Sequence, residues 1–133
     1  MLIRCNSLLR AHSAVRIQVV RNILALLALD MTPVVPLRGS ISARGDLTPL
    51  AYISGAIEGN PDLAMNCGEG QNHRIIPASQ ALQEAGLTPL EFGPKEGLGP
   101  LNGTAFSCGA ANLVLFEANQ LGILSQLLTA MGT

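Results

Sequence analysis

The chain has 133 residues, of which 48% are hydrophobic, 3% aromatic and 13% charged, and its formal net charge is −1. This length fits one domain or part of a larger one, and a near-neutral chain does not attract a polyanion such as nucleic acid. The charged share is well below the roughly 25% of ordinary soluble domains. We therefore expect other subunits, or the rest of a longer polypeptide, to cover apolar surface that a body of this size cannot hide.

A first helix is predicted from Ser7 to Leu29. Every residue from Ile23 to Leu29 is apolar, which indicates that this end is buried by this chain or by another. Prolines at 33 and 36 end the helix and force extended backbone.

A loop of small residues around Arg44, from Gly39 to Asp46, comes next. The pair Thr48-Pro49 predicts the start of a second helix, with threonine as N-cap and proline at the first helical position. This helix is expected to run to about Glu58, where Gly59-Asn60-Pro61 stops it.

Residues 62 to 74 are polar and contain glycine, so we expect a surface excursion there. Residues 74 to 76 are interpreted as one arm of a short hairpin. Ser79 is then expected to cap a short helix over residues 80 to 85, which Gly86 ends.

The second glycine-rich loop, Gly93 to Gly103, feeds a long apolar helix that is predicted to start near Thr104. Three amide side chains repeat every seven residues along this helix: Asn112, Asn119 and Gln126. Amides are costly in lipid, so we interpret the helix as buried in a bundle rather than as a membrane span. The amides are expected to fix its register by hydrogen bonds between helices, and a ligand role is the alternative.

These elements predict a mainly α fold. We expect a segment of a long-helix bundle, with two glycine-rich loops and at most a short hairpin, and one partial domain over residues 1–133 without a second domain. Aliphatic, alanine- and leucine-rich composition favours packed helices in the same way.

Charged residues and cysteines exclude several classes of site. Residues 1–45 hold six arginines and one acid, but the arginines are dispersed without interleaved aromatic residues, which argues against nucleic-acid binding. The three cysteines, Cys5, Cys67 and Cys108, form no CxxC pair, and the two histidines are isolated. We therefore expect no metal site, and reduced thiols in a cytoplasmic protein whose N-terminus shows no signal peptide.

Both glycine-rich loops lead into a helix N-terminus, where unpaired N–H groups favour an anion or an electron-withdrawing group. The second loop has the pattern GxGxxxG with Lys95 ahead of the glycines. It matches neither the dinucleotide fingerprint nor the P-loop, so phosphate binding is disfavoured.

Five segments resemble the aromatic amino acid ammonia-lyase family, its phenylalanine branch and fungal members above all. RCNSLLRAHSAVR matches the segment before the family's cofactor loop, and TPVVPLRGSISARGDLTPLAYISGAIEGNP matches that loop and its helix. GPKEGLGPLNGTA matches the second loop, and LVLFEAN with LLTAM continues the next helix. The order and spacing agree over almost the whole chain.

This resemblance implies a reaction and a set of site residues. The family eliminates ammonia from L-phenylalanine to give trans-cinnamate. It uses 4-methylidene-imidazol-5-one (MIO), which its own Ala-Ser-Gly forms with loss of two waters. By position, Ala43, Arg44 and Gly45 are the precursor residues, and Asp46 would organise the turn. Asn102 would contact the prosthetic group and the substrate amine. On the same basis, Leu98 would line the pocket for the aromatic ring.

Arg44 stands where the family has serine. The methylidene requires a leaving group on the β-carbon, and arginine has none there. Arginine also brings a permanent cation into the site. We therefore expect no MIO in this chain as written and no catalysis that depends on it.

The resemblance further implies a homotetramer, aromatic amino acid or cinnamate as ligand, and an interior fragment whose other catalytic residues lie outside the chain. The alternative is a non-catalytic lyase-like subunit or an aromatic-acid-binding relative. A third hypothesis is a degenerate fragment that folds poorly alone. Arg44-Gly45-Asp46 also spells the adhesion tripeptide RGD, which a segment resembling an internal loop disfavours.

Overall fold

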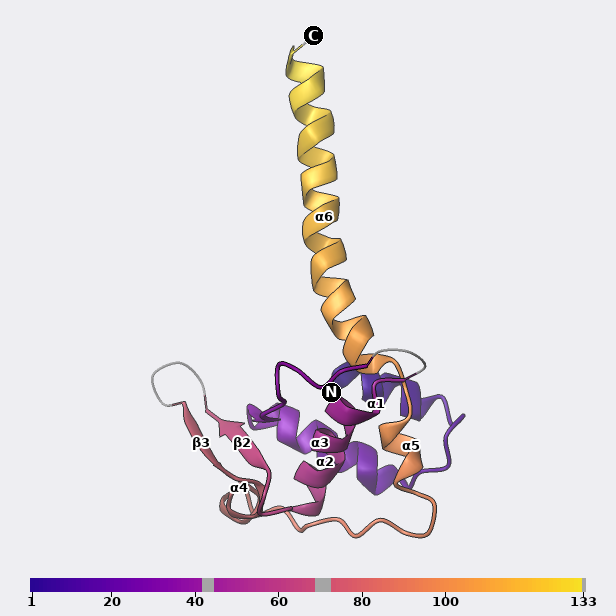
Figure 1. Ribbon diagram of the computed structural model, residues 1–133, viewed down its shortest axis with the longest axis vertical. Helices are drawn as coiled ribbons and strands as arrows, with labels where there is room; N and C mark the ends of the chain where they lie inside the picture. The colour runs from indigo at the N-terminus through magenta and orange to yellow at the C-terminus, as the bar shows by residue number, and fades with distance from the viewer. Residues whose placement is uncertain (42–44, 69–72, 133) are drawn as a thin grey trace.

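The computed structural model describes residues 1–41, 45–68 and 73–132. Its helices are α1 (Leu2–Leu9), α2 (Ile17–Ala28), α3 (Leu47–Glu58), α4 (Ala78–Glu84), α5 (Leu98–Leu101) and α6 (Ala105–Gly132). The short strands β1 (Met31–Pro33), β2 (Ala64–Cys67) and β3 (Arg74–Pro77) form an antiparallel sheet in that order. Figure 1 shows a body made of the sheet and the shorter helices, from which α6 projects. The expected mainly α fold is confirmed, and the sheet has one strand more than a single hairpin.

The core of the body lies between α2, α3 and β2. Its largest fully buried apolar side chains include Ile23 and Leu26 of α2, Leu50 and Ile57 of α3, and Met65 of β2. Burying each such side chain stabilises the fold by about 1.5–3 kcal/mol. The two glycine-rich loops are attached to this core, one at the start of α3 and the other around α5.

The predicted first helix is wrong in its middle, where the chain turns between α1 and α2. Ala11 has a positive φ of 59°, which ends the helical path. Arg16 is extended, with ψ at 146°, and its main-chain N–H donates to Glu96 Oε1 at 2.8 Å. A contact across 80 residues of sequence therefore overrides a local pattern that contains neither glycine nor proline.

Helix α3 starts two residues earlier than predicted, with Asp46 rather than Thr48 as N-cap. Pro49 is then the third helical residue, a position where a missing N–H has no effect because the first four N–H groups of a helix have no intrahelical partner. The predicted end is confirmed: Gly59 caps the helix in the left-handed conformation, with φ at 73°.

The expected surface excursion at 62–74 is wrong for the residues of β2. Met65 and Cys67 are buried there, while Ala64 and Asn66 face the other side and are half-buried. A period-two pattern over four residues is too short to distinguish from a loop in the sequence. The expected hairpin arm is confirmed as β3, which pairs Ile76 with Met65.

Helix α4 begins directly after β3, with Pro77 as its N-cap. The prediction that Ser79 caps this helix is therefore wrong by two residues. Proline fixes φ near the helical value and leads into the first turn without a side-chain cap. Gly86 follows the helix with a positive φ of 65°, as expected of a terminating glycine.

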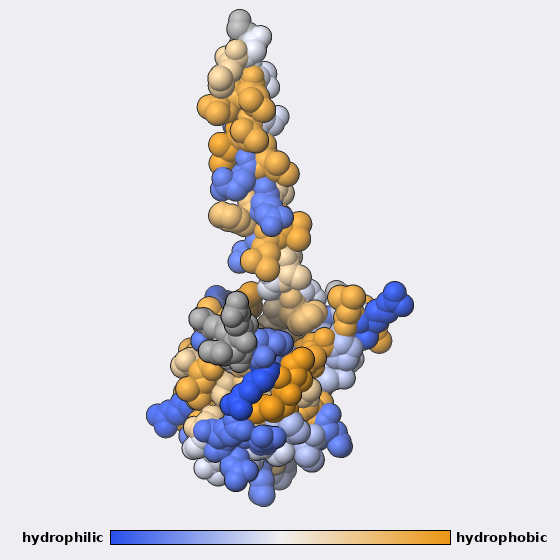
Figure 2. Space-filling model, turned by 90° about the vertical axis from the view of Figure 1, so that its left-hand side faces the viewer, coloured by the Kyte–Doolittle hydropathy of each residue, from blue (hydrophilic) through white to orange (hydrophobic). Residues whose placement is uncertain are grey.

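Helix α6 is not buried within this chain. All its residues from position 110 onward are exposed, including Asn112, Asn119 and Gln126. Figure 2 shows apolar side chains along most of the projecting rod. The helical stretch 98–132 is long and apolar enough, by length and composition, to cross a membrane. That this helix is buried in a bundle stays a prediction, because other polypeptide would have to cover it. The same holds for the prediction that its amides fix the register of the bundle.

Candidate functional site

The two glycine-rich loops meet at the start of α3. The N–H of Asp46 donates to the carbonyl oxygen of Gly103 at 3.0 Å. A Cβ atom placed on Gly45 would lie 2.8 Å from Asn102 Oδ1 and 3.3 Å from the nitrogen of Gly103. The structure thus brings together Gly45, Asp46 and Asn102, which sequence reasoning assigned to one site.

Gly45 is required at this contact for two reasons. Its φ of +154° lies in the region that favours glycine, and no side chain fits between its backbone and Asn102. Ala43 and Arg44, the other two residues of the tripeptide, lie outside the described residues, and so does the first residue of the RGD sequence.

Asp46 joins the first loop to α3. Its side chain is 2% exposed, and its carboxylate accepts a hydrogen bond from the Ser40 hydroxyl. The main chain of the same residue bonds to the second loop through Gly103. A buried carboxylate satisfied in this way links Ser40 to the start of α3; that Asp46 organises the turn stays a prediction.

Leu98 and Asn102 face a common surface hollow of about 240 Å³, which Ser13 and Lys95 also line. Leu98 is 63% exposed and contributes to a second, larger hollow of about 640 Å³ beside Tyr52. The smaller hollow thus combines the apolar side chain of Leu98 with polar side chains, including the Asn102 amide, as small-ligand sites do.

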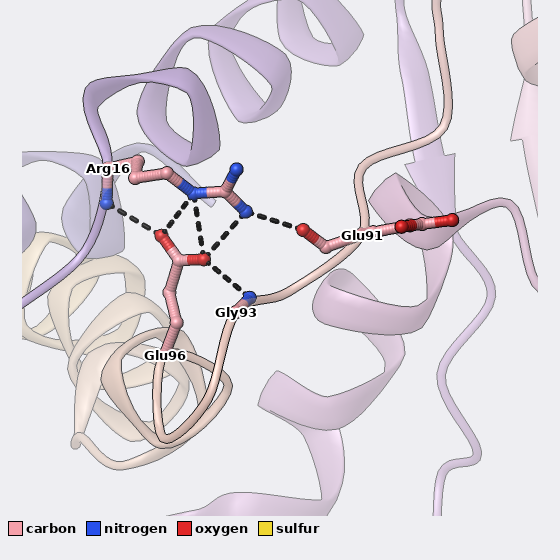
Figure 3. A network of polar contacts seen from close by, with 4 residues as sticks. All are labelled: Arg16, Glu91, Gly93 and Glu96. Atoms are coloured by element: carbon pink, nitrogen blue, oxygen red, sulfur yellow. Dashed lines mark hydrogen bonds and ion pairs between the residues drawn. The ribbon is translucent and has the colours of Figure 1, made fainter.

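Sequence reasoning missed Glu96, which anchors the second loop (Figure 3). Its carboxylate accepts from the main-chain N–H of Arg16 at 2.8 Å and from that of Gly93 at 3.0 Å. The Arg16 guanidinium adds two bonds from Nε, at 3.0 and 2.9 Å, and an Nη2–Oε2 contact of 2.7 Å. Arg16 also donates to the carbonyl oxygen of Glu91. The bonds that Glu96 accepts from Arg16 and Gly93 lower its pKa from 4.5 to about 2, the Arg16 side chain contributing most.

Sequence reasoning also missed Arg4. This side chain is 3% exposed and donates to main-chain carbonyl oxygens of the turn that leads into Asn102. Neither Arg4 nor Glu96 gives a local signal, because their partners lie 80 or more residues away in the sequence, apart from Gly93.

Cysteine, histidine and carboxylate side chains do not gather into a metal-binding group of three within the described residues. Cys5 and Cys67 are buried, and burial raises the pKa of both thiols. Protonated buried thiols are poor ligands and poor nucleophiles.

Replacing Gly45 by alanine should destabilise the fold by about 1–3 kcal/mol, because the new methyl group meets Asn102 and the backbone conformation becomes strained. Gly86→Ala is the matched control: it also places alanine at a positive φ, but nothing lies within 4 Å of the new methyl group. Urea unfolding measures both variants. If Gly45→Ala lowers the free energy of unfolding no more than Gly86→Ala does, the close approach of the two loops is contradicted.

The chain is similar to known proteins over almost all of its length. The family model for aromatic amino acid lyase matches residues 1–133. The phenylalanine ammonia-lyase lenB of Aspergillus lentulus is 67% identical over all of this chain and 18% of its own length. A phenylalanine aminomutase (L-beta-phenylalanine forming) of Talaromyces islandicus is 53% identical over 97% of this chain and 18% of its own.

Among solved structures, a phenylalanine ammonia-lyase from the yeast Rhodosporidium toruloides superposes with a TM-score of 0.88 at 48% identity. This match covers 93% of the chain and 19% of that protein. The chain thus spans about a fifth of the length of the relatives it matches. Matches of this extent to the family model and to these relatives show that the chain belongs to the aromatic amino acid lyase family.

Proposed function

We propose that this chain forms the cofactor-loop region of a phenylalanine ammonia-lyase-like protein. The observation that carries the proposal is the contact between the two loops, where Gly45 lies against Asn102 and Asp46 bonds to Gly103. This contact holds the last residue of the precursor tripeptide beside the amide that would face the prosthetic group and the substrate amine. Relatives named for phenylalanine chemistry, both lyase and aminomutase, support an aromatic amino acid as the ligand.

The chain as written does not fit the MIO group. Gly45 lies against Asn102, which supports a site for such a ring at this position, but residue 44 is arginine. Without a hydroxyl on its β-carbon, no water can leave to form the methylidene. We therefore propose that this chain does not eliminate ammonia by the family's route.

The second candidate function is that of a non-catalytic lyase-like subunit which binds an aromatic acid. The hollow that Leu98 and Asn102 line favours it, because it places an apolar side chain near an amide and near the Lys95 cation without requiring the electrophile. Assembly as a homotetramer in the cytoplasm, and a place in L-phenylalanine catabolism or phenylpropanoid metabolism, are parts of the same proposal. The apolar length of α6 is consistent with a helix that other subunits cover.

We expect the chain to bind trans-cinnamate and to release no ammonia from L-phenylalanine. Titration calorimetry measures the binding, and an ammonia assay measures turnover. Leu98→Ala should weaken binding by about fivefold, since it removes roughly 1 kcal/mol of apolar contact.

Leu37→Ala is the matched control, because Leu37 is 98% exposed and does not line the hollow. Equal affinity in the Leu98→Ala and Leu37→Ala variants would remove aromatic-acid binding at this hollow. Ammonia release by the unchanged chain would refute its assignment as non-catalytic.

A further inference from the structure

Arg4 carries a buried charge at the junction between α1 and the second glycine-rich loop. Its Nε donates to the carbonyl oxygen of Pro100 at 2.9 Å, and its Nη2 donates to that of Asn102 at 2.9 Å and to that of Gly99. All these acceptors belong to the turn that ends α5 and presents Asn102. One planar guanidinium therefore ties together the carbonyl groups of a single turn.

The charge of Arg4 is balanced by dipoles rather than by an acid. Among the described residues, the ion pairs within 4.0 Å join Arg16 to Glu96 and Arg74 to Glu84. Carbonyl oxygens are the atoms that replace water around Arg4, whose burial lowers the pKa of the guanidinium. A buried charge held by main-chain carbonyl groups fixes the path of that main chain, because moving it would leave the charge unsolvated.

Gly103 leaves the space that the guanidinium occupies. A Cβ atom on this residue would lie 2.2 Å from Arg4 Nη1, and the three nearest atoms all belong to Arg4. On its other side, Gly103 accepts the hydrogen bond from Asp46, and Asn102 Oδ1 faces Gly45. The turn 102–103 is thus packed between Arg4 and the first loop.

We infer that Arg4 is a positioning residue that holds Asn102 and Gly103 against Gly45 and Asp46. The inference deepens the proposed function and rests on it for its catalytic meaning, since Asn102 is the residue proposed to face the substrate. Lysine cannot replace Arg4, because an ammonium is a point charge that lacks the fixed fork of donors.

Amide hydrogen exchange in the chain as it stands tests the positioning directly. In Arg4→Lys and Arg4→Met, the Asp46 amide should exchange at least about tenfold faster, because its acceptor on Gly103 loses its support. Amides in the middle of α3 should keep their rates. Leu8→Ala is the matched control, since Leu8 is on the same helix and 3% exposed but does not bond to the turn. An Asp46 rate that is unchanged, or that moves only in step with α3, overturns the inference.

The converse change is Gly103→Ala, which pushes the guanidinium out of its place. In the unchanged chain it should accelerate exchange at Asp46 as Arg4→Met does. In an Arg4→Ala background it should add little, because the clash has gone. Equal effects of Gly103→Ala in both backgrounds would show that the turn does not depend on Arg4.

A second readout separates this inference from the proposed function. In an Arg44→Ser background, loss of two waters reports whether the loop can cyclise, and Arg4→Lys should slow that loss by about tenfold or more, while Leu8→Ala should not. If Arg44→Ser itself loses no water, the cofactor role fails while Asp46 exchange still decides the role of Arg4. If the water is lost equally fast with Arg4→Lys, Arg4 does not position the site.

Discussion

The Arg44→Ser variant should have an intact mass that is two waters below the mass calculated from its sequence. Serine restores the hydroxyl that can leave from the β-carbon, and the backbone nitrogen of Gly45 supplies the ring-closing atom. The fold already holds Gly45 in a glycine-type conformation, with φ at +154°, beside Asn102. Pre-arranged neighbours favour cyclisation because the entropy of bringing the groups together is lost on folding. Mass spectrometry of the intact chain, with near-ultraviolet absorbance, measures the result.

Arg44→Ala is the matched control for this experiment. Alanine removes the cation, as serine does, but has no leaving group, so the chain should lose at most the one water of ring closure. A folded Arg44→Ser variant with unmodified mass would show that this segment does not hold the loop in the reactive geometry. Equal mass loss in both variants would contradict the role of the hydroxyl.

Replacing Glu96 by glutamine should remove a pH-dependent part of the stability. Hydrogen bonds from Arg16 and from the N–H of Gly93 lower the pKa of Glu96 from 4.5 to about 2. A carboxyl group whose pKa is lowered on folding stabilises the native state above its unfolded value, and this contribution is lost as the pH falls through the folded value. The parent chain should therefore lose stability between about pH 5 and pH 2, in the window that the shift from 4.5 to about 2 defines.

The size of this loss should be about 2 kcal/mol, less than the full shift implies, because water screens the exposed half of the Arg16 side chain. Glu96→Gln should be less stable than the parent at pH 7 and should show a flatter profile in acid. Urea unfolding at several pH values measures both. Glu117→Gln, on the exposed part of α6, is the control and should keep the parent's acid slope; the same slope in Glu96→Gln would contradict the assignment.

Much of the helical framework could be predicted from the sequence because its signals are local. Gly59 ends α3, and Gly86 follows α4, each with the positive φ that glycine favours. The long apolar stretch after the second glycine-rich loop predicts a helix from about Thr104, and α6 begins at Ala105. The identity of residue 44 was also informative by itself. Arginine has no leaving group on its β-carbon, and no tertiary contact can supply one.

The contacts that hold the site could not be predicted in the same way. The break before α2 depends on Glu96 accepting the N–H of Arg16, and the turn at Asn102 depends on Arg4. In the sequence, Arg16 looks like an ordinary polar residue of the predicted first helix, and Arg4 lies before that helix. The meeting of the two loops followed from the family resemblance, whereas the local sequence showed two separate glycine-rich segments.

The long sequence separations within this site have a consequence for how the chain acquires its structure during synthesis. The acceptors of Arg4 lie 95 to 98 residues further along, and the carboxylate of Glu96 lies 80 residues beyond Arg16. A nascent chain leaving the ribosome must hold these cationic side chains in water until the second loop emerges. Loop closure over such distances is slow. The site should therefore be among the last parts of the body to assemble.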